Sequence, residues 1–336
     1  MPDASNTSTP AGPQASDYLQ RFYFEDLALR GAVVKLSNSF IESINGRDYP
    51  KLVKHLLGEC LAASVLMSTN LKRATRLSLQ ARGEGALSLL MAEAQLSPGT
   101  PGATAQQGMS QTVRALARLD ASAQHAELLA REQASLQALL GRAQLAITIE
   151  PLTLASNGAR GKTPAGERYQ GIVGLDHARL DRCLEHYFLR SEQLPTFLKL
   201  HAQGDQAAGL LLQKIPSSSA SDGLQQVADD SWEEITVLAS SLQNDELLEL
   251  PAANSLHRLF HAHSYRLAAA QPVAFACSCS ATRTGAALMH IDPREIEQIL
   301  AEDGEIVMDC EFCSARYRFD RAAIDSLSTQ QSSTRH

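Results

Sequence analysis

The chain has 336 residues, a formal net charge of −7 and 44% hydrophobic residues. This length and composition permit two or three folded units with a sizeable core. The acidic balance argues against a nucleic-acid partner, which normally selects for a basic patch. Between Leu256 and Asp320, nine Asp and Glu residues outnumber six Arg residues, and Lys is absent.

The amino-terminal residues carry no recognisable targeting signal. Residues 1–17 are polar, contain Pro and Gly and lack the apolar stretch of a signal peptide, so a disordered tail is expected there. No run of the sequence approaches the eighteen or so apolar residues that span a bilayer. We therefore expect a cytoplasmic protein without a membrane partner, in which thiols stay reduced.

Residues 18–215 predict an α+β core domain with a mainly antiparallel sheet and packed helices. Alternating apolar residues favour strands over residues 74–79, 86–89 and 113–119, and strands are also expected over residues 31–36, 145–149, 169–174, 197–201 and 210–215. Apolar residues at helical spacing favour helices over residues 38–45, from Pro50 through Leu61, and over 176–193. Turn-rich segments are expected at 97–111 and, as a hairpin tip, at 157–162. The core contains neither a Walker loop nor a dinucleotide glycine fingerprint.

Two isolated cysteines of the core, Cys60 and Cys183, fall on the apolar faces of predicted helices. Both are expected to be small buried hydrophobes. His186 follows Cys183 at one helical turn, but no third group that would orient a Cys–His catalytic pair is evident. The sequence therefore predicts no catalytic residue and no enzyme.

Residues 216–262 predict a flexible and helical linker. Residues 216–223 are rich in Ser and form the flexible part. Ser231 and Glu234 match a capping box, which predicts a helix start with Ser231 as N-cap. Pro251 begins a second short helix. The apolar face of the first helix consists of Trp232, Ile235, Leu238 and Leu242. Short amphipathic helices are marginal in water, so this face is a candidate moving part.

Residues 263–325 hold four of the six cysteines, as Cys277-x-Cys279 and Cys310-x-x-Cys313. Two close thiol pairs a few tens of residues apart can converge on one tetrahedral zinc ion, and such a site is closed and by default structural. Around them we expect strands at 273–276, 306–308 and 317–319, a helix from Asp292 to Gly304, and a disordered tail over 326–336.

The four thiols allow other interpretations. A thioredoxin-like CxxC expects a βαβ context, whereas Cys310-x-x-Cys313 lies between short strand-like runs. His261, His263 and His290 could in principle replace a thiol ligand, but four cysteines at suitable spacing are already present. A purely structural zinc ribbon and a zinc site that also senses oxidants both remain open at this point.

The chain resembles the redox-regulated holdase chaperones, the thirty-three-kilodalton heat-shock protein family, from about Tyr18 to Asp320. The resemblance is carried by Glu167-Arg-Tyr-Gln-Gly-Ile-Val-Gly174, by Tyr187-Phe-Leu-Arg-Ser-Glu-Gln-Leu-Pro195, and by Leu250-Pro-Ala-Ala-Asn254. The spacing of the two terminal cysteine pairs is highly specific to the family. Ser314 departs from the pattern, because many relatives have glycine after the last cysteine.

The resemblance implies an ATP-independent cytoplasmic holdase that binds unfolding client proteins and prevents their aggregation under oxidative stress. In the reduced state one zinc ion on Cys277, Cys279, Cys310 and Cys313 would keep it inactive. Oxidation would form the disulfides Cys277–Cys279 and Cys310–Cys313, release zinc and unfold the linker, and the active form would be a homodimer.

How the zinc unit reaches the linker is a separate hypothesis: the folded unit clamps the linker helices against the core, and its unfolding frees their apolar face. The small size of the unit makes metal loss sufficient to unfold it. Two competing functions are a zinc-ribbon interaction protein without redox switching, and an enzyme using Cys183 and His186. The first predicts zinc that survives mild oxidants, and the second predicts turnover of a small substrate.

Overall fold

The computed structural model describes residues 17–71, 73–98, 109–120, 122, 125–131, 133–152, 168–215 and 222–333. Residues 1–16 of the expected tail, the expected hairpin tip and residues 216–221 of the connector lie outside these ranges. The expected loop at 97–111 is described only at its two ends, where residues 97–98 and 109–111 are strand.

The described strands form an 11-stranded sheet in the order β7-β6-β3-β4-β5-β11-β1-β2-β9-β8, with β10 beside β1. All of the pairings are antiparallel except β11 with β5. The strands are β1 (Tyr18–Phe24), β2 (Leu29–Leu36), β3 (Thr75–Gly83), β4 (Leu87–Pro98), β5 (Met109–Leu119), β6 (Ala143–Pro151), β7 (Tyr169–Gly174), β8 (Thr196–Gln203), β9 (Gln206–Lys214), β10 (Tyr265–Leu267) and β11 (Gln271–Phe275). The predicted α+β class and all eight predicted core strands are confirmed.

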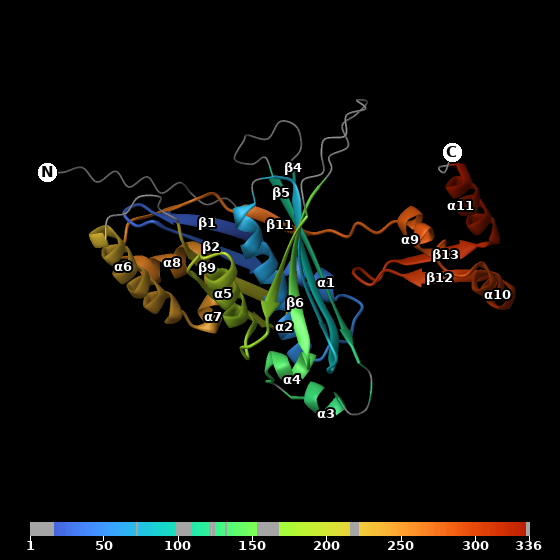
Figure 1. The fold of residues 1–336 in the computed structure, drawn as a ribbon, viewed down its shortest axis with the longest axis horizontal. Helices are drawn as coiled ribbons and strands as arrows, with labels where there is room; N and C mark the ends of the chain where they lie inside the picture. The colour runs from blue at the N-terminus through green and yellow to red at the C-terminus, as the bar shows by residue number, and fades with distance from the viewer. Residues whose placement is uncertain are drawn as a thin grey trace.

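Helices cover this sheet on both faces (Figure 1). On one side lie α1 (Asn38–Ile44), α2 (Lys51–Met67) and α5 (Leu180–Ser191), as predicted, although α5 begins four residues later than expected. The strand β2 shows the two-sided burial: Val34 and Leu36 pack in the cluster around α2, whereas Leu29 and Val33 pack in a second cluster on the opposite face. Successive side chains of a strand point to opposite faces, so a strand buried on both sides is mostly apolar on both, and Lys35 is the buried exception in β2.

The helix α2 is the centre of the first cluster. Together with the short turn after it, this segment is long and apolar enough to cross a membrane by length and composition, but 83% of its most apolar window is buried inside the fold. Gly58 permits the close approach of α2 to β8, because a Cβ there would lie 2.5 Å from the Cβ of Ala202. The membrane-like composition of α2 is therefore that of a core helix.

The linker helices form the second cluster, against β1, β2, β8 and β9. They are α6 (Asp222–Ser240), α7 (Asn244–Glu249) and α8 (Ala252–Phe260). Ile235 and Leu242 are 0% and 2% exposed, and Trp232 and Leu238 pack partly buried beside them. The four residues predicted as one apolar face therefore lie together on the sheet.

The predicted helix start at Ser231 is wrong, because α6 begins at Asp222 and Ser231 lies inside it. The preceding Leu224-Gln-Gln-Val-Ala228 contains good helix formers, which extend the helix past a capping-box pattern that also occurs in helix interiors. The helix α7 was not predicted. It begins at a true capping box, in which the backbone N–H of Gln243 donates to Glu246 Oε2 at 3.1 Å.

A small lobe follows β11. It contains α9 (Ala281–Leu288), α10 (Pro293–Asp303), β12 (Glu305–Asp309), β13 (Arg316–Asp320) and α11 (Arg321–Ser333). Asp292 caps α10 by accepting from Arg294 N at 2.9 Å, and Gly304 ends it at φ 77°, as predicted. The expected tail from residue 326 is wrong as far as Ser333, because α11 continues there. The helix is held to the lobe by Ile324, which is 6% exposed in the lobe's core.

The strands β10 and β11 belong to the core sheet, although the sequence placed them with the cysteine unit from residue 263. Tyr265–Leu267 pair with β1, and β11 lies between β1 and β5. This pairing joins strands separated by about 250 residues in the sequence. The cysteine lobe therefore begins at the point where β11 leaves the sheet.

Candidate metal centre

The four cysteines of the lobe come from two short segments. Cys277 and Cys279 follow β11 directly, and Ser280 then caps α9 by accepting from Arg283 N at 3.2 Å. Cys310 and Cys313 lie in the turn between β12 and β13. This turn is closed by two backbone hydrogen bonds, from Ser314 N to Cys310 O at 2.8 Å and from Cys310 N to Ala315 O at 2.9 Å.

The four sulfur atoms converge, all lying within 4.8 Å of one another. The nearest contacts join the two pairs: Cys277 Sγ lies 3.6 Å from Cys310 Sγ, and Cys279 Sγ lies 3.3 Å from Cys313 Sγ. All four are free thiols with intermediate exposure. The structure thus brings together the residues that the spacing predicted, as a set that could hold a metal ion.

The electrostatics of this cluster favour a cation. Burial raises the pKa of Cys313 to about 12, and its hydrogen bonds with the other three thiols add to the rise. Tyr317 OH donates to Cys279 Sγ at 3.0 Å, and this bond is the main cause that raises the pKa of Tyr317 to about 12. Four closely spaced thiols resist collective ionisation without a counter-charge, and a divalent ion supplies it.

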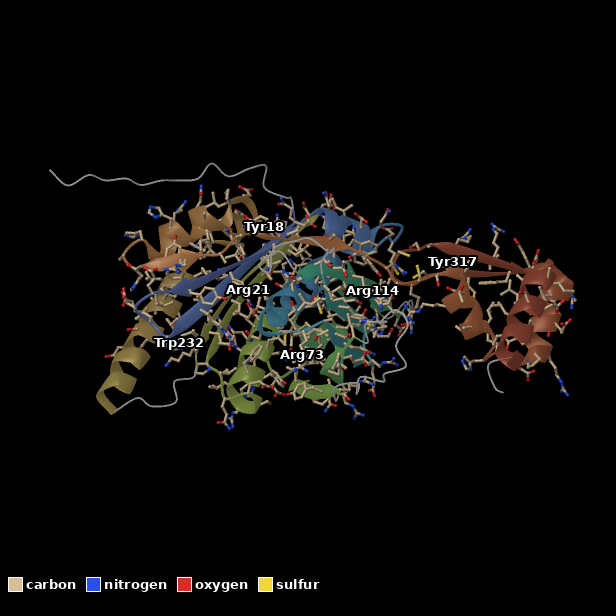
Figure 2. The ribbon with its side chains drawn as sticks, turned by 90° about the horizontal axis from the view of Figure 1, so that it is seen from above. Tyr18, Arg21, Arg73, Arg114, Trp232 and Tyr317 are labelled. Carbon is tan, nitrogen blue, oxygen red and sulfur yellow. The ribbon has the colours of Figure 1, made fainter. Side chains whose placement is uncertain are left out.

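The arginine Arg114 of β5 joins the cluster to the core. Its guanidinium pairs with Glu93 at 2.5 Å, and its Nη1 donates to Ser278 Oγ at 3.2 Å and lies 3.8 Å from Cys277 Sγ. Its Cζ also lies 3.9 Å above the ring of Phe312, between the second pair of cysteines. One core side chain therefore contacts both cysteine-bearing segments, and Figure 2 shows Arg114 on the side of the core nearest the lobe.

Further contacts hold the same turn. Arg118 of β5 pairs with Glu311 at 2.6 Å, and Arg47 donates to the backbone carbonyl of Glu311. Ser314 Oγ lies 3.5 Å from the carbonyl of Asn45. Ser314 has φ 57°, in the left-handed region that glycine adopts most readily. It stands at the position where many members of the family have glycine. The lobe is thus docked on β5 and the end of α1 through a polar surface.

The lobe and the linker helices lie at opposite ends of the molecule. Figure 1 shows α6, α7 and α8 at one end of the long axis and α9 to α11 at the other, and Figure 2 shows the same for Trp232 and Tyr317. The hypothesis that the lobe clamps these helices directly is therefore wrong. The covalent path runs instead from Cys277 through β11 and β10 to α8.

The other predicted residues lie as follows. Cys60 is 0% exposed and burial raises its pKa to about 12, and Cys183 is 1% exposed with its thiol donating to His177 O at 3.4 Å. Both are core residues, as predicted. His263 lies 3.4 Å from Glu234, and neither it nor His261 or His290 belongs to a metal-type cluster within the described residues.

Sequence reasoning missed two features of the chemistry. Arg114 looks like any other charged residue of an alternating strand, and only tertiary structure places it against Cys277. A second metal-type cluster, of His55, Glu59 and His201, joins α2 to β8 across about 140 residues of sequence. The i, i+4 spacing of His55 and Glu59 on a helix was its only sequence signal.

Comparison with known proteins agrees with this architecture. A family model described as Hsp33 protein matches residues 17–320. The 33 kDa chaperonin of Ectopseudomonas mendocina is 40% identical over 327 residues, covering 96% of this chain and all of that protein. The 33 kDa chaperonin of Shewanella frigidimarina is 38% identical over 312 residues, covering 93% of this chain and 96% of that protein.

A crystal structure of the 33 kDa chaperonin from Thermotoga maritima is similar in fold, with a TM-score of 0.68 at 19% identity over 94% of this chain and 99% of that one. The predicted family resemblance is confirmed. Since the family match spans the core, the linker and the four-cysteine lobe, and full-length relatives share about two residues in five, the chain belongs to the Hsp33 family.

Proposed function

We propose that this chain is a redox-regulated, ATP-independent holdase that binds unfolding client proteins and prevents their aggregation under oxidative stress. The observation that carries the proposal is the convergence of four thiols where β11 leaves the core sheet. The family's chaperone role supports it. We further propose that the protein acts in the cytoplasm, without catalytic turnover and without a nucleic-acid or membrane partner.

The resident ion would be Zn²⁺, one per chain in the reduced state, held by Cys277, Cys279, Cys310 and Cys313. A closed set of four thiolates suits a structural zinc site. The lobe depends on it because its core is small, with six buried apolar residues: Leu288, Ile296, Leu300, Ile306, Phe319 and Ile324. Structural zinc contributes about 10–16 kcal/mol of apparent binding free energy, comparable to the whole stability of a domain of about 5–15 kcal/mol.

Oxidation would be the trigger. Zinc keeps its ligands as thiolates, the form that oxidants attack. In each cysteine pair, the two sulfurs lose two electrons and form one disulfide, while a peroxide oxidant accepts the electrons and is reduced to water or alcohol. The proposed disulfides are Cys277–Cys279 and Cys310–Cys313, and with all four ligands consumed the ion leaves.

The signal would pass through β11. Cys277 is only two residues beyond Phe275, whose partner in the sheet is Val113. Unfolding of the lobe removes the anchoring contacts of Arg114 and leaves β11 and the three-residue β10 to fray from β1. Strand β10 leads back to α8, so its release undocks the linker without any contact between lobe and helices.

The undocked linker would expose the client-binding surface. Trp232, Ile235, Leu238 and Leu242 leave the sheet, and the face formed by Phe22, Val33 and Leu210 becomes accessible. Contiguous apolar surface of this kind binds non-native chains with little sequence preference. We propose that the same surface supports a homodimer of the oxidised protein.

We propose that the chain is divided into a core, a linker and a redox switch. The core comprises residues 18–215, the linker lies between 216 and 262, and the redox switch occupies most of 263–325. Strands β10 and β11 are assigned here to the core, because they complete its sheet. The proposed switch does not involve residues 1–17 or 326–336.

The decisive experiment follows zinc and client aggregation together. The reduced protein is treated with peroxide, zinc release is read with a chromogenic chelator, and light scattering follows a thermally unfolding client. We expect suppression of aggregation to rise with zinc release and to reverse on reduction. Cys60→Ala, which removes a thiol outside the cluster, should behave as the wild type. Suppression by the fully reduced, zinc-loaded protein, or zinc that survives oxidation, would favour a zinc-ribbon interaction protein instead.

A lobe-side variant tests the path through Arg114. Phe312→Ala removes the ring from the guanidinium but leaves the Arg114–Glu93 pair intact. A cation–π contact at a partly exposed site contributes about 1 kcal/mol, so linker release should become roughly fivefold more favourable. Val307→Ala, at an exposed position of β12, is the matched control. Equal behaviour of the two variants would exclude this contact from the path.

A further inference from the structure

The core contains a second cluster of ligand-type side chains, far from the cysteines in the sequence. His55 and Glu59 lie one turn apart on α2, and His201 lies on β8. Their three nearest ligand atoms lie within 4.8 Å of one another. Gly58, between the two α2 residues, allows the helix and strand to approach closely enough for this.

The hydrogen bonding of His55 already has the pattern of a metal ligand. Its Nδ1 contacts the backbone carbonyl of Ala202, which fixes the ring and its tautomer. Its Nε2 is thereby directed at Glu59 Oε1, 3.1 Å away. A backbone carbonyl on the outer ring nitrogen is the usual second partner of a metal-bound histidine. Two ligands of one ion at about 2.0–2.2 Å lie roughly 3–3.5 Å apart, so this pair is already suitably spaced.

The other two groups complete the set. The side chain of Glu59 is only 12% exposed, so its carboxylate is stabilised by a neighbouring positive charge, which protonated His55 or a bound cation can supply. The ring of His201 lies 5.0 Å from that of His55, edge to face at 73°. The side chain of His55 is 38% exposed, which leaves the cluster open to an entering ion.

We propose that His55, Glu59 and His201 form a second metal site, for a divalent transition ion of the imidazole-binding class such as Zn²⁺ or Ni²⁺. Two imidazoles and one carboxylate suit these ions, and three protein ligands leave an open position for water. The ion would tie α2 to β8, independently of the thiol centre. Its affinity is expected to be weaker than that of four thiolates.

The test uses the full-length, reduced protein already carrying one Zn²⁺ on its thiols. Calorimetric titration with ZnCl₂, and thermal melting with and without it, should reveal one further ion per chain and a raised melting temperature. His201→Asn and Glu59→Gln should each weaken this second binding at least tenfold and abolish the melting shift. His201 is half-buried, so its variant is expected to fold even if Glu59→Gln does not.

The exposed pair His257 and His261, one turn apart on α8 and its C-cap with ring centroids 6.4 Å apart, is the competing explanation. His257→Asn should leave the second ion in place. Loss of that ion in His257→Asn, its retention in His201→Asn, or uptake of no second ion by the wild type would each overturn the proposal. Titration of the Cys277→Ser protein separates the two centres, because the second ion should still bind there.

Discussion

A buried lysine sets how tightly the linker rests on the core. Lys35 of β2 is 7% exposed and donates from Nζ to the carbonyl of Leu247 in α7. Burial lowers its pKa from 10.5 to about 8. Since one pKa unit corresponds to about 1.4 kcal/mol, holding this ammonium in the docked state costs about 3 kcal/mol at neutral pH.

Lys35→Met removes the charge and keeps most of the volume. The lost hydrogen bond costs about 1 kcal/mol, so the variant should be about 2 kcal/mol more stable at pH 7. With a urea slope of about 1–3 kcal/mol per M, the unfolding midpoint should rise by roughly 1 M. The proposed release of the linker on oxidation should slow accordingly.

The pH dependence of the stability difference between wild type and Lys35→Met tests whether the buried charge causes it. Below about pH 8 the lysine is protonated in both states and the full cost is present. Between pH 8 and 10.5 the unfolded chain binds more protons, so wild-type stability gains on that of the variant as pH rises. Near pH 10.5 the variant should be the less stable protein, by about the lost hydrogen bond. Urea unfolding at both pH values, in reductant, measures this reversal; Lys51→Met, at an exposed position, is the control. An identical stability difference at the two pH values would refute the reasoning.

Three further predictions concern the switch and its supports. Trp232, the one tryptophan of the chain, packs beside Lys214 and the second cluster. Its fluorescence emission should therefore shift to the red when zinc is released. An unchanged spectrum in the oxidised, client-binding form would contradict release of the linker. Burial opposes ionisation of Asp17, but hydrogen bonds from Ser39, and from the backbone N–H groups of Ser37 and Asn38 at 2.9 and 3.0 Å, lower its pKa. Its stabilisation is present above pH 3.8 and is lost as pH falls through the lowered value. Asp17→Asn should therefore cost about 1.5–3 kcal/mol in urea unfolding at pH 7 and progressively less as the pH is lowered below 3.8. Ser314→Gly should stabilise the zinc-bound lobe by about 1 kcal/mol, seen as slower zinc transfer to a chelator, whereas faster transfer would show that the Ser314–Asn45 contact outweighs the backbone strain.

Local patterns predicted the parts of the structure that depend on local chemistry. The convergence of the four lobe cysteines was predictable, because two thiol pairs at these spacings have few uses other than binding one metal ion. The strand β2 and the apolar face of α2 were likewise predictable from neighbouring residues. The cap at Asp292 was also predictable, because its pattern coincides with a Pro at the first position of the helix.

Contacts between distant segments were not predictable in this way. Nothing in Tyr265–Leu267 or Gln271–Phe275 says that they pair with the first strand rather than with each other. At Ser231 a local pattern predicted a helix start that does not exist, because the same capping pattern can also occur inside a helix. Arg114 gained its position against Cys277 and Phe312 only from that long-range pairing of β11 with β5.

The place of β11 in the strand order also has a consequence for biosynthesis. Because it lies between β5 and β1, those two strands keep unpaired edges until residue 275 has left the ribosome. For most of its own translation the nascent chain therefore has an incomplete sheet with exposed strand edges, the kind of non-native surface that holdase chaperones bind. Completion of the molecule awaits the last fifth of the polypeptide, and the acquisition of metal by the terminal cysteines would be the final step of its maturation.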